Sequence, residues 1–205
     1  MRIIAGSARG FPLVGPKGRT TRPALDSLRE SIFAILGARV EGARVLDLFA
    51  GVGAFGLEAL SRGARSATFV EQDRAALEAL ERNIAALHFG VRSRVSRGDA
   101  LLVPRASEVG PDEPFDLLFV DPPFALFTSE DDARRLFARV RELLEPPFGS
   151  EDATLVLRLP APWRRERPFP AARARRYGRS EVLFLDRENA APTSDETPSD
   201  EANTQ

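Results

Sequence analysis

Three glycines and a set of acidic residues stand at the ends of short apolar runs, and these residue types could bind a nucleoside. Gly51, Gly53 and Gly56 follow the apolar run 43–51 with the spacing G-x-G-x-x-G. This spacing is typical of a tight turn whose backbone can approach a ligand. Glu71 comes twenty residues after Gly51, where a carboxylate can accept hydrogen bonds from two ribose hydroxyls. The pattern predicts a site for an adenosine-bearing cofactor.

The glycine spacing alone also fits a nicotinamide dinucleotide, so the choice between the two cofactors depends on the nearby carboxylates. Asp47 precedes Gly51 by four residues, and we expect it inside the loop. A carboxylate there suits the ammonium group of a methionine and would repel a pyrophosphate. Asp99 follows the next apolar run, where it either accepts from an adenine amino group or caps a turn. These carboxylates favour S-adenosylmethionine as the cofactor.

The run 115–124 ends in Asp121, Pro122, Pro123 and Phe124, which could hold an aromatic amine. Two successive prolines fix the backbone and remove two N–H groups, so carbonyls and the Asp121 carboxylate are left as acceptors. Such acceptors can orient the two N–H donors of an exocyclic base amine, and a phenyl ring can stack on the base, for about 1–3 kcal/mol. We therefore expect these four residues to be the catalytic ones, acting by orientation on a base taken out of its stack.

The elements that must position these residues alternate along the chain. Apolar runs at 43–51, 66–73, 93–101, 115–124, 153–160 and 180–187 predict strands, and amphipathic stretches at 21–37, 54–63, 74–90 and 131–144 predict helices. This order predicts a Rossmann-like α/β fold with a mostly parallel sheet, helices on both faces and a last strand that could run antiparallel. We expect a small hairpin extension at residues 1–20, the main domain at 21–187 and a disordered acidic tail at 188–205.

Composition sets the class of protein. The 205 residues fit one domain, no apolar stretch is long enough for a membrane span, and no secretion signal opens the chain, so a cytoplasmic protein is expected. The absence of cysteine excludes thiolate metal sites, and no metal is expected. Without the four acidic residues of 189–205, the net charge of −1 becomes +3, and arginines gather at 1–30 and 158–179. Such clusters indicate a polyanion-binding face, although an arginine-rich composition would also produce them.

The motifs together resemble those of a known family. DLFAGVGAFGLEALSRGA, FVEQD, GDA and FVDPPF, with the opening MRIIAGSARG and RPALDSLRESIF, are similar to the RsmD family of bacterial 16S rRNA guanine-N2 methyltransferases. The similarity covers about residues 1–185, and the N-terminal stretches narrow it to this family. Ala24, Ser27 and the Arg158-Leu159-Pro160 stretch depart from residues that are common in the family.

The resemblance implies a substrate, a cofactor and roles for particular residues. It implies methylation of guanine 966 in the 16S rRNA of an assembling small subunit, with S-adenosylmethionine as methyl donor, by a protein that we expect to be a monomer. The residues that would hold the cofactor are Asp47, Phe49, Ala50, Gly51, Gly53, Glu71, Gln72, Asp99 and Ala100. The residues that would approach the RNA are Arg2, Arg9, Arg19, Arg22, Pro23 and Arg29.

Three other functions fit part of the pattern. A DNA or RNA adenine-N6 methyltransferase would use the same amine chemistry, and an NAD-dependent dehydrogenase would use the same glycine turn. An RNA-binding assembly factor without catalysis would need the basic segments alone.

Overall fold

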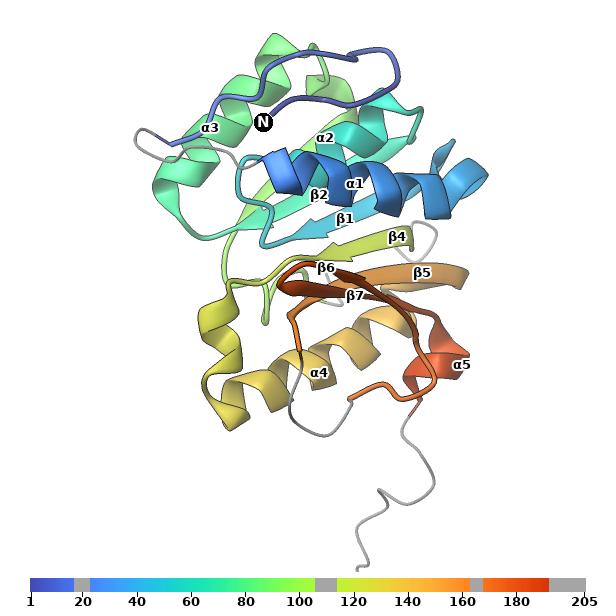
Figure 1. Ribbon diagram of the computed structural model, residues 1–205. Helices are drawn as coiled ribbons and strands as arrows, with labels where there is room; N and C mark the ends of the chain where they lie inside the picture. The colour runs from blue at the N-terminus through green and yellow to red at the C-terminus, as the bar shows by residue number, and fades with distance from the viewer. Residues whose placement is uncertain (17–22, 106–113, 163–167, 192–205) are drawn as a thin grey trace, which may run out of the picture.

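The computed structural model places seven strands in one sheet and covers both faces of that sheet with helices (Figure 1). It describes residues 1–16, 23–105, 114–162 and 168–191. The strands are β1 (Arg44–Leu48), β2 (Ser66–Glu71), β3 (Ser93–Arg97), β4 (Phe115–Val120), β5 (Gly149–Pro160), β6 (Arg173–Tyr177) and β7 (Ser180–Leu185). The α-helices are α1 (Pro23–Leu36), α2 (Ala54–Ser61), α3 (Arg74–Ala86), α4 (Glu130–Leu144) and α5 (Arg187–Ala190). The short 3-10 helices are η1 (Gly37–Val40), η2 (Gly90–Arg92) and η4 (Phe124–Phe127).

The strand order is β3-β2-β1-β4-β5-β7-β6. The pairs from β3 through β5 are parallel, whereas β7 runs antiparallel to both β5 and β6. This topology confirms the predicted Rossmann-like fold with a mostly parallel sheet and an antiparallel late strand. Because the parallel strands share one direction, the carboxyl ends of β1, β2 and β4 meet at the same edge of the sheet.

Helices α1, α2 and α3 cover one face of the sheet, and α4 with α5 covers the other (Figure 1). Alternate residues of β4 enter the two cores: Leu117 and Phe119 face α1 and α2, whereas Leu118 and Val120 face α4. The Phe119 ring packs against Phe33 of α1, with ring centroids 5.5 Å apart, and stacks on Phe55 of α2 at 5.1 Å. Burial on both faces explains why the central strands are continuous apolar runs.

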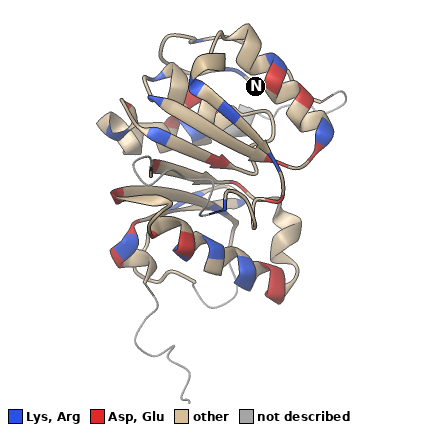
Figure 2. Ribbon diagram, turned by 180° about the vertical axis from the view of Figure 1, so that it is seen from behind, with Lys and Arg blue, Asp and Glu red and all other residues tan. Residues whose placement is uncertain are grey.

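The helices begin where their sequences provide a cap. The Asp73 carboxylate accepts a hydrogen bond from the Ala76 N–H at the start of α3, and Ser129 caps α4 by accepting from Asp132 N–H. The first turn of α4 is acidic, which suits the positive end of the helix dipole. Charges of both signs alternate along the outer face of α4 (Figure 2), so this face is a solvated surface.

The described part of the predicted N-terminal extension, residues 1–16, packs on helices α2 and α3 instead of standing apart. Its backbone turns back on itself through the Ile3 N–H to Phe11 carbonyl bond and a single bridge between Arg2 and Pro12. Ile3 and Leu13 are buried in the same core as α1 and α2. We call residues 1–16 the N-terminal segment.

Three buried polar side chains hold the N-terminal segment in place. Glu58 accepts from the N–H groups of Ile4 and Ala5, and Ser61 Oγ accepts from the Ala8 N–H. The amide of Asn83 pairs with the backbone N–H and carbonyl of Val14, and its nitrogen also donates to the carbonyl of Val52 in the glycine turn. Glu58, Ser61 and Asn83 are each at most 3% exposed, so their partners are fixed by burial.

Two features differ from the sequence-based expectation. Strand β6, the basic sequence RARRY, was not predicted, because its charges hide the alternation that brings Ala174 onto one core and Tyr177 onto the other. The prediction of a disordered tail from residue 188 is wrong for its first residues: residues 187–190 form α5, and Ala190 is buried. Residues 192–205 of that tail lie outside the described residues. In the described part of the chain, no helix has the length and apolarity that crossing a membrane requires.

Candidate active site

The predicted site residues gather where β1, β2 and β4 end. Strand β1 lies between β2 and β4, and the pairs Leu48–Val70 and Leu48–Val120 bring the three strand ends level. The Asp121 N–H lies 3.5 Å from the Leu48 carbonyl, which continues the contact one residue beyond β4. The glycine turn after β1 and the proline bend after β4 are therefore neighbours in space.

The glycine turn requires backbone conformations that most residues avoid. Gly51 has a φ of 56° and Gly53 a φ of 84°, and Gly53 is the residue from which α2 begins. A Cβ at Gly56 would lie 2.3 Å from the Phe69 ring, so the third glycine lets α2 pack closely on β2. A Cβ at Gly51, in contrast, would meet no protein atom within 4 Å. The turn is thus open on the side where a ligand could approach its backbone.

Asp47 lies in strand β1, where it is 1% exposed, and not in the loop as the sequence analysis expected. The apolar run continues through this residue, so the strand extends to Leu48 and carries the carboxylate inward. Its Oδ2 accepts a hydrogen bond from the Gly56 N–H at 2.9 Å. Burial raises the pKa of Asp47 well above its ordinary value; the Gly56 bond opposes this rise, and the charges of Asp121 and Glu71 add to it.

Glu71 is the last residue of β2, as predicted, and it ties the glycine turn to that strand. Its Oε2 accepts from the Gly51 N–H at 2.7 Å, and its Oε1 accepts from the N–H groups of Gln72 and Asp73 at 2.8 Å each. Three charge-assisted bonds fix the carboxylate beside the open turn. A ligand with hydroxyl groups could exchange with the Gly51 bond.

The remaining predicted cofactor residues line the same edge but differ in exposure. Asp99 Oδ1 accepts from the Leu101 N–H, so it caps a turn, which was the alternative considered for this residue. Ala100 is 3% exposed and Ala50 7% exposed, whereas Gln72 is exposed. The structure therefore brings Asp99 to the end of β3 and assigns it a local hydrogen bond.

The bend after β4 presents a carboxylate and a ring to the same edge. Pro122 is buried and Pro123 is exposed, and Phe124 opens η4 with 36% of its surface exposed. The Pro123 carbonyl accepts from the Leu126 N–H, so this carbonyl is used inside η4 and is not an outward acceptor as expected. The Asp121 carboxylate is an acceptor that the bend offers, and its side chain is 26% exposed.

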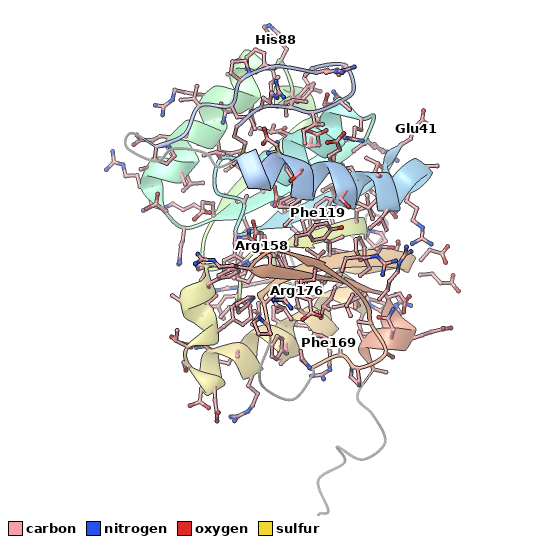
Figure 3. All side chains as sticks on the ribbon, in the orientation of Figure 1. Glu41, His88, Phe119, Arg158, Phe169 and Arg176 are labelled. Carbon is pink, nitrogen blue, oxygen red and sulfur yellow. The ribbon has the colours of Figure 1, made fainter. Side chains whose placement is uncertain are left out.

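Arg158, near the end of β5, contacts two residues of the bend. Its Nε lies 2.5 Å from Asp121 Oδ1, and its guanidinium carbon lies 5.1 Å from the centre of the Phe124 ring. Figure 3 shows Arg158 reaching from β5 toward the end of β4. Desolvation raises the pKa of Asp121, and the charge of Arg158 opposes that rise. From the sequence, this arginine was expected in a basic cluster, and no role in the site was predicted for it.

The predicted RNA-contacting arginines separate in the structure. The side chain of Arg2 is 70% exposed, and Arg9 is also exposed. Arg29, however, is 2% exposed: the helical spacing of α1 turns it inward, where it donates to the Arg2 carbonyl and to Asp26. Arg29 is therefore a packing residue, and its prediction as an RNA contact was wrong. Arg19 and Arg22 lie outside the described residues, as does the side chain of Pro23.

A groove of about 740 Å³ lies at the opposite edge of the sheet, where β4 and β5 begin. Its lining includes Asp116, Glu151, Asp152 and Glu188, together with Arg39, whose guanidinium donates to Thr154. Most of these charges face solvent, and the strand ends that carry the glycine turn lie at the other side. The groove therefore does not belong to the candidate active site.

The fold and the site define the class of protein. A mixed seven-strand sheet with an antiparallel β7, a glycine turn after β1 and an acidic bend after β4 is the arrangement of a Rossmann-like methyltransferase. The model of the family described as "Conserved hypothetical protein 95" matches residues 1–186, and the chain belongs to that family. The predicted family assignment, which includes the RsmD proteins, is thus confirmed.

Individual relatives agree with this assignment. The chain is 43% identical over 126 residues to "Ribosomal RNA small subunit methyltransferase D" of Escherichia coli K12, with 60% of each chain covered, so the match spans less than two thirds of that relative. The structure "Putative methyltransferase yhhF" from Escherichia coli superimposes with a TM-score of 0.71 at 32% identity, over 90% of this chain and 96% of that one. A Thermus protein, "TTHA0928", gives a TM-score of 0.71 at 31% identity, over 91% and 99% of the two chains.

Proposed function

We propose that the chain transfers a methyl group from S-adenosylmethionine to the exocyclic N2 amine of a guanine in 16S rRNA, at position 966, within an assembling small subunit. The observation that carries the proposal is the adjacency of two features. The glycine turn and the Asp121–Phe124 bend follow neighbouring parallel strands, and Asp121 is close enough to raise the pKa of Asp47. A methyl donor held at the glycine turn and a base held at the Asp121–Phe124 bend would meet at the same edge of the sheet.

The donor set fits S-adenosylmethionine better than a dinucleotide. Asp47, Glu71 and Asp121 bring three carboxylates to the site, and Arg158 is engaged by one of them. A pyrophosphate would be repelled by this charge, whereas the sulfonium and ammonium groups of S-adenosylmethionine would be attracted. The open Gly51 side of the turn leaves room for a ligand beside Glu71. These features support the methyl donor and argue against the dehydrogenase alternative.

Within this site the chain's own residues orient the acceptor. The Asp121 carboxylate would accept a hydrogen bond from the base amine, and the exposed Phe124 ring would stack on the base. Glu71 would hold the ribose of the cofactor, with the glycine turn closing beside it. When bound, S-adenosylmethionine supplies an electrophilic methyl group. The rate enhancement then comes from alignment and from a charged acceptor at the amine.

The choice of ribosomal RNA rests on relatives and on the family resemblance. The Escherichia coli relative carries the name of a small-subunit rRNA methyltransferase. Exposed Arg2 and Arg9 lie on the N-terminal segment and could contact phosphates. Guanine-N2 as the target atom is the finer part of the proposal and follows from the resemblance to the RsmD family.

The test is methyl transfer from labelled S-adenosylmethionine into small subunits that lack this modification. We expect wild-type protein to label guanine N2, and Asp121→Ala to lose at least about a hundredfold in rate, as after loss of one transition-state contact. Calorimetry should show cofactor binding by Asp121→Ala, which separates loss of chemistry from loss of fold. Asp131→Ala, at a carboxylate that is 82% exposed on α4, is the matched control and should remain active.

Three results would each overturn the proposal. Labelling of adenine in DNA or RNA offered in competition would favour the adenine-N6 alternative. Binding of NADH without binding of S-adenosylmethionine would favour a dehydrogenase. Binding of subunits without any methyl transfer by wild-type protein would favour a non-catalytic assembly factor.

A further inference from the structure

Arg158 is placed to act on the candidate substrate site through other residues. It is the third residue from the end of β5, and the pairing of Val120 with Leu157 sets it beside Asp121. Its side chain is 19% exposed, and it contacts both the carboxylate and the ring of the bend. One guanidinium thus links the two groups that would receive the base.

The contact between Arg158 and Asp121 is close but incomplete as a hydrogen bond. Arg158 Nε and Asp121 Oδ1 are 2.5 Å apart, yet both atoms are buried and neither makes a hydrogen bond of regular geometry. Removing either partner from such a desolvated pair leaves the other charge buried and uncompensated. Arg158 therefore controls whether Asp121 is available as a charged acceptor.

The surrounding charges make Arg158 more important to Asp121. Asp47 from β1 lies close enough to interact with Asp121, and Glu71 from β2 interacts with Asp47, so the carboxylates repel one another. Among the described residues, Arg158 from β5 is the cation that acts on Asp121. Without it, desolvation would be left unopposed and would favour the protonated form of Asp121.

We propose that Arg158 is a positioning residue for methyl transfer, which pairs with the Asp121 carboxylate, favours its charged form and holds it and the Phe124 ring in the geometry that receives the base amine. The inference rests on the proposed function. A guanidinium suits this task because it is planar and can lie over the Phe124 ring while one edge meets the carboxylate.

A purely structural role for Arg158 makes different predictions. If the arginine only tied β5 to the bend, its loss would lower the free energy of unfolding, and it would lower activity by a factor that does not change with pH. A positioning role makes the loss depend on pH, because activity requires the charged form of Asp121. Lysine, which keeps the charge but lacks the planar group, should preserve the pH dependence and lose part of the alignment.

The experiment compares Arg158→Met and Arg158→Lys with wild-type protein. The Asp121 carboxyl carbon is followed by carbon-13 NMR across pH, with its signal assigned by Asp121→Asn. We expect its titration midpoint to lie at higher pH in Arg158→Met and close to the wild-type position in Arg158→Lys. Arg74→Met is the matched control, since it breaks an arginine–carboxylate pair on the exposed face of α3 and should leave the midpoint unchanged.

Single-turnover methylation supplies the second readout. Below the wild-type midpoint, Arg158→Met should lose about tenfold to about a hundredfold in rate, the latter being typical of misplacement by an ångström. The loss should shrink as the pH rises, and the S-adenosylmethionine concentration that gives half the maximal single-turnover rate should stay near the wild-type value.

The two readouts separate the inference from the function that it rests on. An unchanged Asp121 midpoint in Arg158→Met would overturn the positioning role, even if the wild-type protein methylates guanine. Equal losses in Arg158→Met and Arg158→Lys at all pH values would overturn it as well. Absence of methylation by wild-type protein, with the midpoint shifted as expected, would instead refute the proposed function.

Discussion

Replacing Glu58 with alanine should loosen the N-terminal segment from α2 and lower the free energy of unfolding. Glu58 is fully buried, and its carboxylate accepts from the N–H groups of Ile4 and Ala5 at 2.7 and 3.0 Å and from Arg62 Nε at 2.7 Å. One side chain thus satisfies two backbone donors that are 53 and 54 residues away in the sequence.

The size of the effect follows from the groups that lose a partner. Each backbone N–H left unsatisfied in a buried position costs about 1–3 kcal/mol. Arg62 stays partly solvated at 21% exposure and retains its contact with the Phe33 ring, so it adds less. We expect Glu58→Ala to cost about 2–6 kcal/mol, the sum for the two N–H groups that lose their acceptor. Glu58→Gln should cost about 1–3 kcal/mol, because Ile4 and Ala5 donate to different oxygens and the amide nitrogen that replaces one of them cannot accept.

Urea denaturation and amide hydrogen exchange test this reasoning together. Glu78→Ala is the control, because its ion pair with Arg74 is exposed on α3 and its loss should cost about 0.5 kcal/mol or less. In Glu58→Ala the amides of Ile4 and Ala5 should exchange faster. If Glu58→Ala and Glu78→Ala unfold at the same urea concentration, and the two amides stay protected, the docking role assigned to Glu58 is refuted.

Three further perturbations give distinct signatures. Asp47→Asn should stabilise the protein at about pH 8, with a gain that vanishes toward about pH 4 in thermal melts. Burial raises the pKa of Asp47 in the folded protein. The stability that its bound proton contributes is therefore complete at a pH below the pKa of the unfolded chain, and it is lost as the pH rises through the pKa of the folded protein. A gain in stability that does not depend on pH would contradict this. Gly56→Ala should cost about 1–3 kcal/mol, because its Cβ would press on the Phe69 ring, whereas Gly90→Ala has free space and should cost little; equal urea midpoints would refute the packing argument. Asn83→Ala should lose about 1 kcal/mol for each of its three hydrogen bonds and bind S-adenosylmethionine several-fold more weakly by calorimetry, because one bond supports the glycine turn; unchanged affinity would remove that link.

Local pattern predicted the elements that are buried in regular structure. Strand β4 is a continuous apolar run and helix α4 has a strong apolar periodicity, and their observed bounds differ from the predicted ones by a few residues at most. Strand β6 was missed because three of its five residues are arginine, and an edge strand needs few apolar side chains. Pairing with β7, not local preference, makes that segment a strand.

The site was predictable where position along a strand decides function, and less so where packing decides it. Glu71 and Asp121 end or follow strands that the sequence defines, so their edge of the sheet could be foreseen. Charge alone could not show that Arg29 and Arg158 have different roles. Arg29 points from α1 into the protein core, whereas Arg158 contacts Asp121 because of the register between β4 and β5. That register depends on how the two strands pair in the folded protein. Once the pairing of Val120 with Leu157 is known, the next position along each strand brings Asp121 and Arg158 together.

Phe49 leaves β1 with a φ of 57°, a conformation that costs a residue with a side chain about 1–2 kcal/mol. Bonds from the Ala50 N–H to the Val70 carbonyl and from the Gly51 N–H to Glu71 hold the chain there. A ribose that took over the Glu71 oxygen would release the second restraint at the moment of binding. Relaxation of the backbone would then contribute to cofactor affinity. A mutation that removes the unfavourable φ at Phe49 in the free protein would therefore stabilise the fold and also weaken cofactor binding.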